Sequence, residues 1–346
     1  MPDSHPSPSH STDPAPPPGA PKNLGKSGGH KSLFGALASI ALFLAALYVL
    51  YRIAGEVKPD DVVEAFRKAG REQIGLALGF TALSYVLLTG YDALAMRQLN
   101  ILAHPARIAF ASFTSYAISF TLGFPWLTAG TVRYWIYSAA NIPSSKVVSL
   151  TLIAGMTFIL GMAVVVGVGL MWQSEAISMI NQATASLNQL FGMAVLSGIL
   201  VYLVWTAAKR RHMRIRSFLI ELPTLGVSLG QLALGAADVC AAAAVLYVLL
   251  PEGHGIAFET FAAVYAFACI LGVVSNAPGG LGVFEATILL AFHSLPREGL
   301  IGALLLFRLC YYLGPFILAV ITLGLYEIVT RLSRTRVRVS GHETDP

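Results

Sequence analysis

The sequence predicts an all-α, polytopic integral membrane protein. Hydrophobic residues make up 55% of the chain and charged residues only 12%, whereas soluble domains carry about 25% charged residues. Several apolar runs are long enough to cross a hydrocarbon core of ~30 Å. Only helices and closed barrels satisfy every backbone hydrogen bond in such a core, and long unbroken apolar runs indicate helices.

The chain begins with a segment that differs from the rest. Residues 1–32 are rich in proline, serine and glycine, and we predict that they form a disordered cytoplasmic tail. Residues 33–53 follow as a first membrane span. The lysines that precede this span predict a cytoplasmic N-terminus, because cytoplasmic segments carry an excess of Lys and Arg. A second span covers residues 74–95.

Charge placement predicts that residues 108–140 do not cross the membrane completely. If they did, the basic cluster in residues 209–216 would lie outside, against the positive-inside rule. A re-entrant hairpin that enters and leaves on the cytoplasmic side removes this conflict. Its tip is predicted at the glycine- and proline-containing break in residues 123–126. Spans at residues 147–172 and 189–207 follow.

The second half is predicted to repeat this arrangement upside down. Residues 222–250 form a span, residues 258–294 form a hairpin that enters from outside, and residues 299–328 return to the cytoplasm. Residues 331–346 are then a basic cytoplasmic tail. The prediction is about six full spans and two re-entrant hairpins, arranged as an inverted repeat.

The tip of the second hairpin has a composition unlike that of a membrane span. Residues 275–285 read SNAPGGLGVFE, so a helix that begins at Phe258 must stop there and a new helix must start near Val283. The amides freed at such a break persist in a membrane only when they are buried in protein or line a wet cavity. In secondary transporters, breaks of this kind mark the binding site near the midplane.

Five ionisable residues lie at apolar depth, where each charge costs roughly 2.5 to 3.5 kcal/mol. They are Asp92, Arg133, Asp238, Glu285 and Arg308. Arginine binds phosphate in a bidentate manner, so the two arginines are candidate ligands for a lipid phosphate. The carboxylates are candidates for a cationic headgroup, a coupling proton or a countercharge. The alternative is that these groups form ion pairs that hold the hairpins in place.

Two further groups of candidate residues have two interpretations each. Asn276, Gly279, Gly280 and Gly282 could offer backbone amides to an anionic group, or they could allow tight helix packing. The aromatic residues could line a headgroup pocket or anchor helix ends at the membrane interface. These aromatic residues are Tyr91, Tyr134, Trp135, Tyr311 and Tyr312.

Soluble enzyme chemistry has no signature in this sequence. The sequence contains no HExxH, GxxxxGK[ST] or GxSxG motif, which are the signatures of zinc proteases, phosphate-binding loops and serine hydrolases. Its three cysteines and eight histidines show no metal-ligand spacing. We therefore expect no enzyme activity, no metal and no cofactor. The net charge is +5, and the Lys and Arg residues cluster between spans and in the tails, so no nucleic-acid partner is expected.

Three segments together resemble the lysylphosphatidylglycerol synthase/flippase transmembrane family. They are SNAPGGLGVFEA, GTVRYWIY and YDALAMRQL, and the resemblance covers residues 33–330. It implies a protein of the bacterial inner membrane that moves a phospholipid between leaflets. The residues at matching motif positions are Arg133, Asn276, Gly279, Gly280 and Glu285.

The sequence departs from the bifunctional members of that family in one respect. In those members an aminoacyl-transferase domain follows the membrane part, whereas only residues 331–346 follow here. Lysine transfer to phosphatidylglycerol is therefore not expected. The sequence leaves three lipid substrates open, namely an unmodified anionic phospholipid, a polyprenyl-linked lipid and a hopanoid. It does not determine the oligomeric state.

We predict a lipid transporter that alternately exposes a polar cleft between its two halves. The alternative is a scaffold or accessory subunit that presents a lipid to an envelope or lipid-biosynthesis protein without translocating it. The proline-rich tail favours this alternative, because extended segments recruit partners. A third interpretation, a membrane transferase, needs a catalytic constellation that the sequence lacks.

Overall fold

A computed structural model describes residue 67 and residues 69–123, 125–208, 212–215, 218–221, 223–275 and 278–340. The predicted disordered tail and the first predicted span, residues 33–53, lie outside the described residues. In the described part of the chain, five helical segments are long and apolar enough to cross a membrane. These are α3 (Arg71–Gln98), α6 (Ser144–Trp172), α8 (Ala185–Ala208), α9 (Leu225–Val248) and the continuous run of α12 and α13 over Arg297–Val329. They coincide with the five other predicted spans, so the polytopic helical fold is confirmed.

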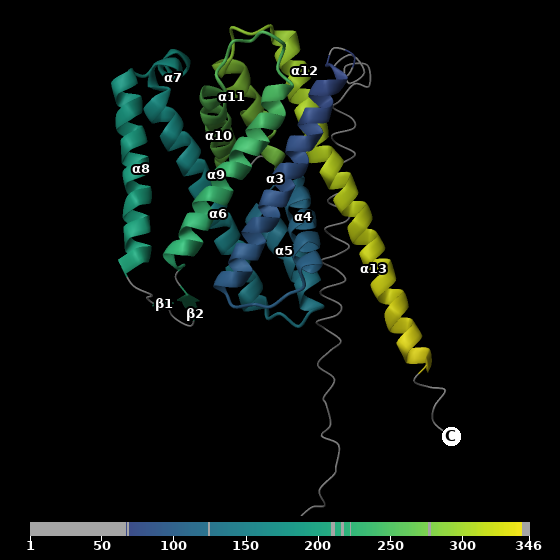
Figure 1. The fold of residues 1–346 in the computed structure, drawn as a ribbon. Helices are drawn as coiled ribbons and strands as arrows, with labels where there is room; N and C mark the ends of the chain where they lie inside the picture. The colour runs from purple at the N-terminus through teal and green to yellow at the C-terminus, as the bar shows by residue number, and fades with distance from the viewer. Residues whose placement is uncertain are drawn as a thin grey trace, which may run out of the picture.

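The first predicted hairpin is present between α3 and α6. It consists of α4 (Pro105–Leu122) and α5 (Pro125–Ser138), which pack against each other. The backbone turns at Gly123, whose φ of 79° is favourable only for glycine. Both helices lie in the lower half of the molecule, and the hairpin opens at that end (Figure 1).

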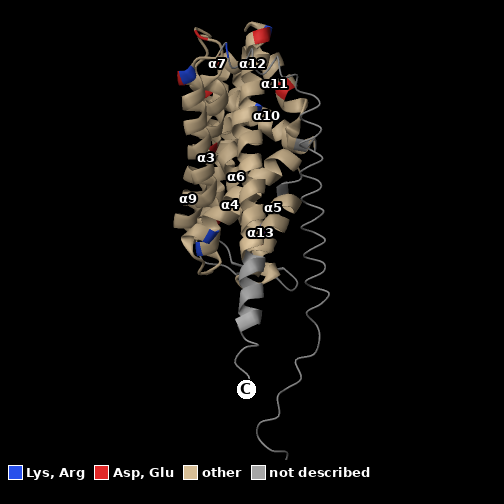
Figure 2. Ribbon diagram, turned by 90° about the vertical axis from the view of Figure 1, so that its right-hand side faces the viewer, with Lys and Arg blue, Asp and Glu red and all other residues tan. Residues whose placement is uncertain are grey.

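The second predicted hairpin lies at the opposite end of the bundle. It consists of α10 (Phe258–Val274), the short 3-10 turn η1 (Pro278–Gly280) and α11 (Val283–Ala291). The predicted stop and the predicted restart at Val283 are both confirmed. In Figures 1 and 2 this hairpin occupies the upper part of the bundle, so the two hairpins enter from opposite ends.

The two halves have matching element orders and opposite directions. The first half is α3, the α4–α5 hairpin and α6, and the second is α9, the α10–α11 hairpin and α12–α13. Helices α3 and α9 pack along each other at the centre and run in opposite directions (Figure 1). This order matches the predicted inverted repeat. Helix α8 lies at the side of the bundle, against α6.

Four features were not predicted. A short helix, α7 (Ser174–Asn181), lies between the predicted spans 147–172 and 189–207. Strand β1 (His212–Ile215) lies in the basic cluster and pairs antiparallel with β2 (Phe218–Glu221), which follows it. They are the only strands in the described part of the chain. Helix α13 (Gly314–Ser340) continues through residues 331–340 of the predicted tail. A π-helical turn, η2 (Arg308–Leu313), joins α12 (Arg297–Phe307) to α13.

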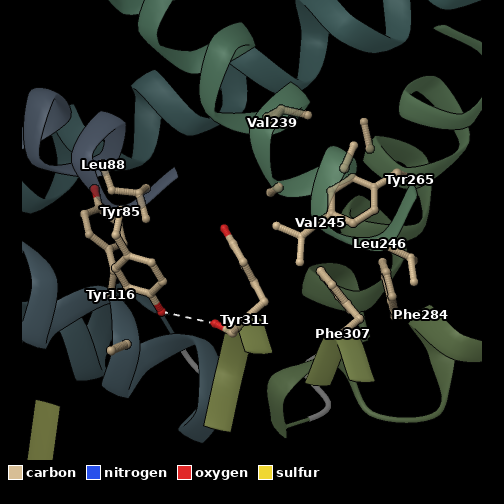
Figure 3. Close-up of a cluster of buried hydrophobic side chains, with 14 of the residues drawn as sticks. Tyr85, Leu88, Tyr116, Val239, Val245, Leu246, Tyr265, Phe284, Phe307 and Tyr311 are labelled. Carbon is tan, nitrogen blue, oxygen red and sulfur yellow. Dashed lines mark hydrogen bonds between the residues drawn. The ribbon is translucent and has the colours of Figure 1, made fainter. Parts of the chain in front are cut away.

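Small residues and aromatic rings form the packing at the centre. A Cβ atom on Gly161 of α6 would overlap the backbone of Gly235 of α9, so these helices cross at a distance that only glycine permits, as is common in membrane bundles. Tyr311 of η2 lies between Tyr85 of the first half and Phe307 beside the second hairpin, with ring centroids 5.9 and 5.4 Å away (Figure 3). The π-helical turn therefore connects the two halves.

Charged residues concentrate at the two ends of the bundle. Figure 2 shows the middle of the ribbon mostly free of Lys, Arg, Asp and Glu. The few charged groups at mid-depth must therefore be held by protein partners, because hydrocarbon offers them none.

Candidate functional site

The π-helical turn η2 directs two chemically distinct side chains to different parts of the bundle. In η2, Arg308 points toward the tip of the second hairpin and Tyr311 toward α3. A π-turn inserts one extra residue into a helix and is frequent at functional sites. Nothing in the local sequence signals it, because the apolar pattern of α12 runs on into α13.

Arg308 and Glu285 form an ion pair at the tip of the second hairpin. Nε of Arg308 donates to Oε1 of Glu285 over 2.6 Å, and Nη2 contacts the same oxygen. Nη1 donates to the carbonyl oxygen of Gly279 over 2.6 Å. The guanidinium also lies 4.6 Å from the ring centroid of Tyr312, a favourable cation–π geometry. Exposed fractions of 17% for Arg308 and 24% for Glu285 keep the pair partly accessible.

The glycines of this tip are required by its backbone. Gly279, Gly280 and Gly282 have φ values of 60°, 65° and 82°, which other residues adopt at a cost of roughly 1–2 kcal/mol each. The N–H of Gly282 donates to Oε2 of Glu285 over 2.8 Å, which caps α11. That amide is therefore already occupied, and the tip is held by both oxygens of Glu285.

The second hairpin tip contacts the end of the first hairpin's entering helix. A Cβ atom on Gly279 would lie 3.2 Å from the carbonyl oxygen of Phe120 and 3.4 Å from that of Thr121, both in the last turn of α4. The ring of Phe120 stacks near Tyr311 at 6.1 Å. The two breaks thus meet inside the protein, as expected for a binding site between inverted halves. Sequence reasoning predicted that this helix ends at the break in residues 123–126, but it did not single out Phe120 or Thr121.

Arg133 and Asp92 form a second ion pair, which is completely buried. Nε and Nη2 of Arg133 donate to the two carboxylate oxygens of Asp92 over 2.9 and 2.7 Å. The guanidinium lies 4.8 Å from the ring centroid of Tyr116. The exposed fractions are 1% and 0%. The pair joins α5 to α3, so in this conformation it fixes the first hairpin and is inaccessible from outside the protein. Arg133 and Glu285 do not contact each other.

Tyr134 is not brought to either ion pair. Its side chain is 43% exposed on the outside of the bundle, while that of Arg133 is buried. Successive residues of an α-helix point about 100° apart, since a turn takes 3.6 residues, so one surface cannot present both. The aromatic ring that stacks on Arg133 is Tyr116, which the sequence did not indicate. Asn276 lies outside the described residues.

Asp238 has surroundings unlike those of Asp92. Its carboxylate accepts hydrogen bonds from Ser84 and Tyr91 of α3, and no ion pair with it occurs in the described part of the chain. The sequence analysis gave Asp92 and Asp238 the same candidate roles, as carboxylates at apolar depth. The structure separates them into a charge-paired and a hydroxyl-bonded carboxyl.

Among the described residues, no group of three or more His, Cys, Asp or Glu side chains is arranged to hold a metal ion. The three cysteines, Cys240, Cys269 and Cys310, carry free thiols on α9, α10 and η2.

Comparison with known proteins gives matches along most of the chain. The chain is 30% identical over 297 residues to an uncharacterized protein of Synechocystis, which covers 83% of this chain and 89% of that protein. It is 28% identical over 302 residues to the inner membrane protein YbhN of Escherichia coli, and this match covers 85% of this chain and 92% of YbhN. A third match is to the phosphatidylglycerol lysyltransferase of Staphylococcus aureus, 26% identical over 305 residues. The chain belongs to the lysylphosphatidylglycerol synthase/flippase transmembrane family.

The matches within this family differ in extent. The match to the lysyltransferase covers 81% of this chain but only 32% of the transferase, whereas the two other relatives match over nearly their whole length. This chain therefore corresponds to the membrane part that the family shares. No family model matches the sequence.

Proposed function

We propose that residues 33–330 form a lipid transporter of the bacterial inner membrane, which moves a phospholipid or a related lipid between leaflets. The observation that supports this function most directly is the contact between the two oppositely entering hairpins at the partly exposed Arg308–Glu285 pair. Transporters built from inverted repeats bind their substrates at such broken helices near the bilayer midplane.

Arg308 is the proposed ligand for the lipid phosphate. Its planar guanidinium matches the geometry of phosphate oxygens, and it is partly exposed, unlike Arg133. A phosphate that binds Arg308 replaces Glu285 as its acceptor. Glu285 then becomes free to leave the tip or to bind a cationic headgroup. The Asp92–Arg133 pair has a different role, because it holds the first hairpin against α3.

An anionic phospholipid is the first substrate class to test. One relative is named a phosphatidylglycerol lysyltransferase and so acts on a membrane phospholipid. The shared region is a third of that protein, so lysine transfer is not proposed for this chain. A lipid phosphate also agrees with an arginine as the accessible cation of the site.

Leaflet exchange in liposomes tests the proposed function. Purified protein is reconstituted with fluorescent phospholipids whose headgroups are anionic, zwitterionic or aminoacylated, and exchange is followed by quenching from outside. We expect headgroup-dependent exchange in the wild type and at least about tenfold slower exchange for Glu285→Gln, which loses a charged hydrogen bond. Glu298→Gln is the matched control, because Glu298 is exposed at the start of α12.

Two outcomes would contradict parts of this proposal. Equal exchange in wild type and Glu285→Gln removes the proposed site. Binding of a fluorescent lipid without exchange under any ion gradient supports the accessory-scaffold function instead.

We also propose that both termini lie in the cytoplasm. The exposed residues Arg97, Arg107 and Lys146 lie at the end where the first hairpin opens, and Lys and Arg accumulate on the cytoplasmic side. In a chain without native cysteines, Leu102→Cys should resist an impermeant thiol reagent added outside, and Glu252→Cys should react. The reverse labelling pattern would overturn this orientation.

A further inference from the structure

Asp238 lies in the middle of α9, and among the described residues its carboxylate accepts hydrogen bonds from hydroxyl groups alone. Its side chain is 3% exposed. Oδ1 accepts a hydrogen bond from Ser84 over 2.5 Å, and Oδ2 accepts one from Tyr91 over 2.9 Å. The Ser84 hydroxyl also lies 2.9 Å from the hydroxyl of Tyr311. Four side chains from three elements thus form one buried polar chain.

Within the part of the chain that the structure describes, the ionisable groups around Asp238 carry no positive charge. They are Tyr85 and Tyr91 of α3, Tyr116 of α4, Cys269 of α10, Tyr311 of η2, and Cys240 on α9 itself. Phenols and thiols are neutral near pH 7. The described acidic side chains at mid-depth therefore differ in their partners. Asp92 and Glu285 each form an ion pair with an arginine, whereas Asp238 forms none. A buried carboxyl without a cation can lose its charge by binding a proton.

Counting hydrogens shows what a proton changes. The three contacts join Tyr311 to Ser84, Ser84 to Asp238, and Tyr91 to Asp238. Each hydroxyl carries one hydrogen. With Asp238 ionised, three hydrogens fill three contacts, and Tyr311 donates to Ser84, which donates to the carboxylate. A proton on Asp238 adds a fourth hydrogen, so one hydroxyl must turn its hydrogen out of the chain.

The displaced hydrogen affects the turn that holds the candidate lipid site. If the added proton lies on Oδ1, Asp238 donates to Ser84, Ser84 donates to Tyr311, and the Tyr311 hydroxyl must find another acceptor. Tyr311 and Arg308 belong to the same π-helical turn, and Arg308 binds Glu285 and the Gly279 carbonyl at the hairpin tip. Protonation is thus linked to the tip through a single turn of helix.

We propose that Asp238 is a proton-binding site, and that its proton is the ion that couples to lipid movement. The first part stands on the geometry of Asp238 alone, and the second rests on the proposed lipid transport. The proton is taken up from water onto a carboxylate oxygen and is released to water when the hydroxyl chain returns to its three-hydrogen state.

Infrared difference spectroscopy measures the proton directly. Full-length protein in lipid nanodiscs is titrated between about pH 5 and about pH 9, the range in which buried carboxyls titrate. We expect the carbonyl band of a protonated carboxylic acid to appear as the pH falls, to be absent in Asp238→Asn, and to persist in the control Glu298→Gln. A band that is unchanged in Asp238→Asn, or that does not titrate in this range, would overturn the proposal.

A second variant tests the site without changing Asp238. Tyr91→Phe removes a donor that stabilises only the ionised carboxylate, so the midpoint of the titration should move to higher pH by about one to two units. An unmoved midpoint would also overturn the proposal, even if Asp238→Asn failed to fold.

The coupling part is tested by leaflet exchange at each pH. Exchange in the wild type should change across the infrared midpoint, and exchange in Asp238→Asn should be independent of pH. Titration of Asp238 without any lipid exchange would leave the proton site standing and reject lipid transport. Exchange with no pH dependence would leave lipid transport standing and reject the coupling.

Discussion

Arg133→Met should lower the free energy of unfolding by about 3–5 kcal/mol, because it leaves the carboxylate of Asp92 buried without its partner. Both residues are almost completely inaccessible, and Asp92 receives two hydrogen bonds from Arg133. The loss should appear as earlier unfolding of the purified protein in mixed detergent micelles.

The double variant Asp92→Leu with Arg133→Met is the matched test of the structural role. Replacing a whole buried pair by apolar side chains is often neutral or stabilising by about 1–4 kcal/mol, so the double variant should recover the stability lost in the single one. It should also keep lipid exchange. A stable double variant without exchange would show that Arg133 takes part in lipid binding, as the sequence first indicated.

Arg308→Lys should slow leaflet exchange about 10- to 100-fold while the protein stays folded. Lysine keeps the positive charge but has no planar fork, so it cannot contact Glu285 and the Gly279 carbonyl in the same geometry. The loss of one hydrogen bond to a charged group costs roughly 1.5–3 kcal/mol, which corresponds to this range.

Arg297→Lys is the control for this substitution. Arg297 is exposed in the first turn of the same helix, so its replacement should leave exchange unchanged. If Arg308→Lys transported lipid at the wild-type rate, charge alone would be sufficient at the tip and the bidentate phosphate site would be rejected.

The spans and both hairpins follow from local properties of the chain. Apolar length and the positions of Lys and Arg predict which segments cross, and the glycines and proline near residue 280 predict where a helix must break. These properties can be read from one segment at a time, because the backbone groups of a membrane-spanning helix must form their hydrogen bonds within that helix. For this reason a helix start near Val283 was predictable, and α11 begins at that residue.

The π-helical turn and the contacts of the α4 aromatic residues were not predictable in the same way. Residues 308–313 have the apolar pattern of an ordinary helix, and the turn is visible only from backbone hydrogen bonding. Phe120 and Tyr116 look like core aromatics in the sequence. Their contacts with Tyr311 and Arg133 depend on where the hairpins end in space.

The sequence by itself determined the membrane fold, its two breaks and the set of ionisable residues placed at apolar depth. Only the tertiary structure decided which of them meet. Asp92 and Arg133 are 41 positions apart, and Ser84 and Asp238 are 154 apart, so no local pattern encodes their contacts. The bundle pairs Arg133 with Asp92 and Arg308 with Glu285, and it leaves Asp238 to hydroxyl groups, because a buried charge takes the partner that packing brings within reach.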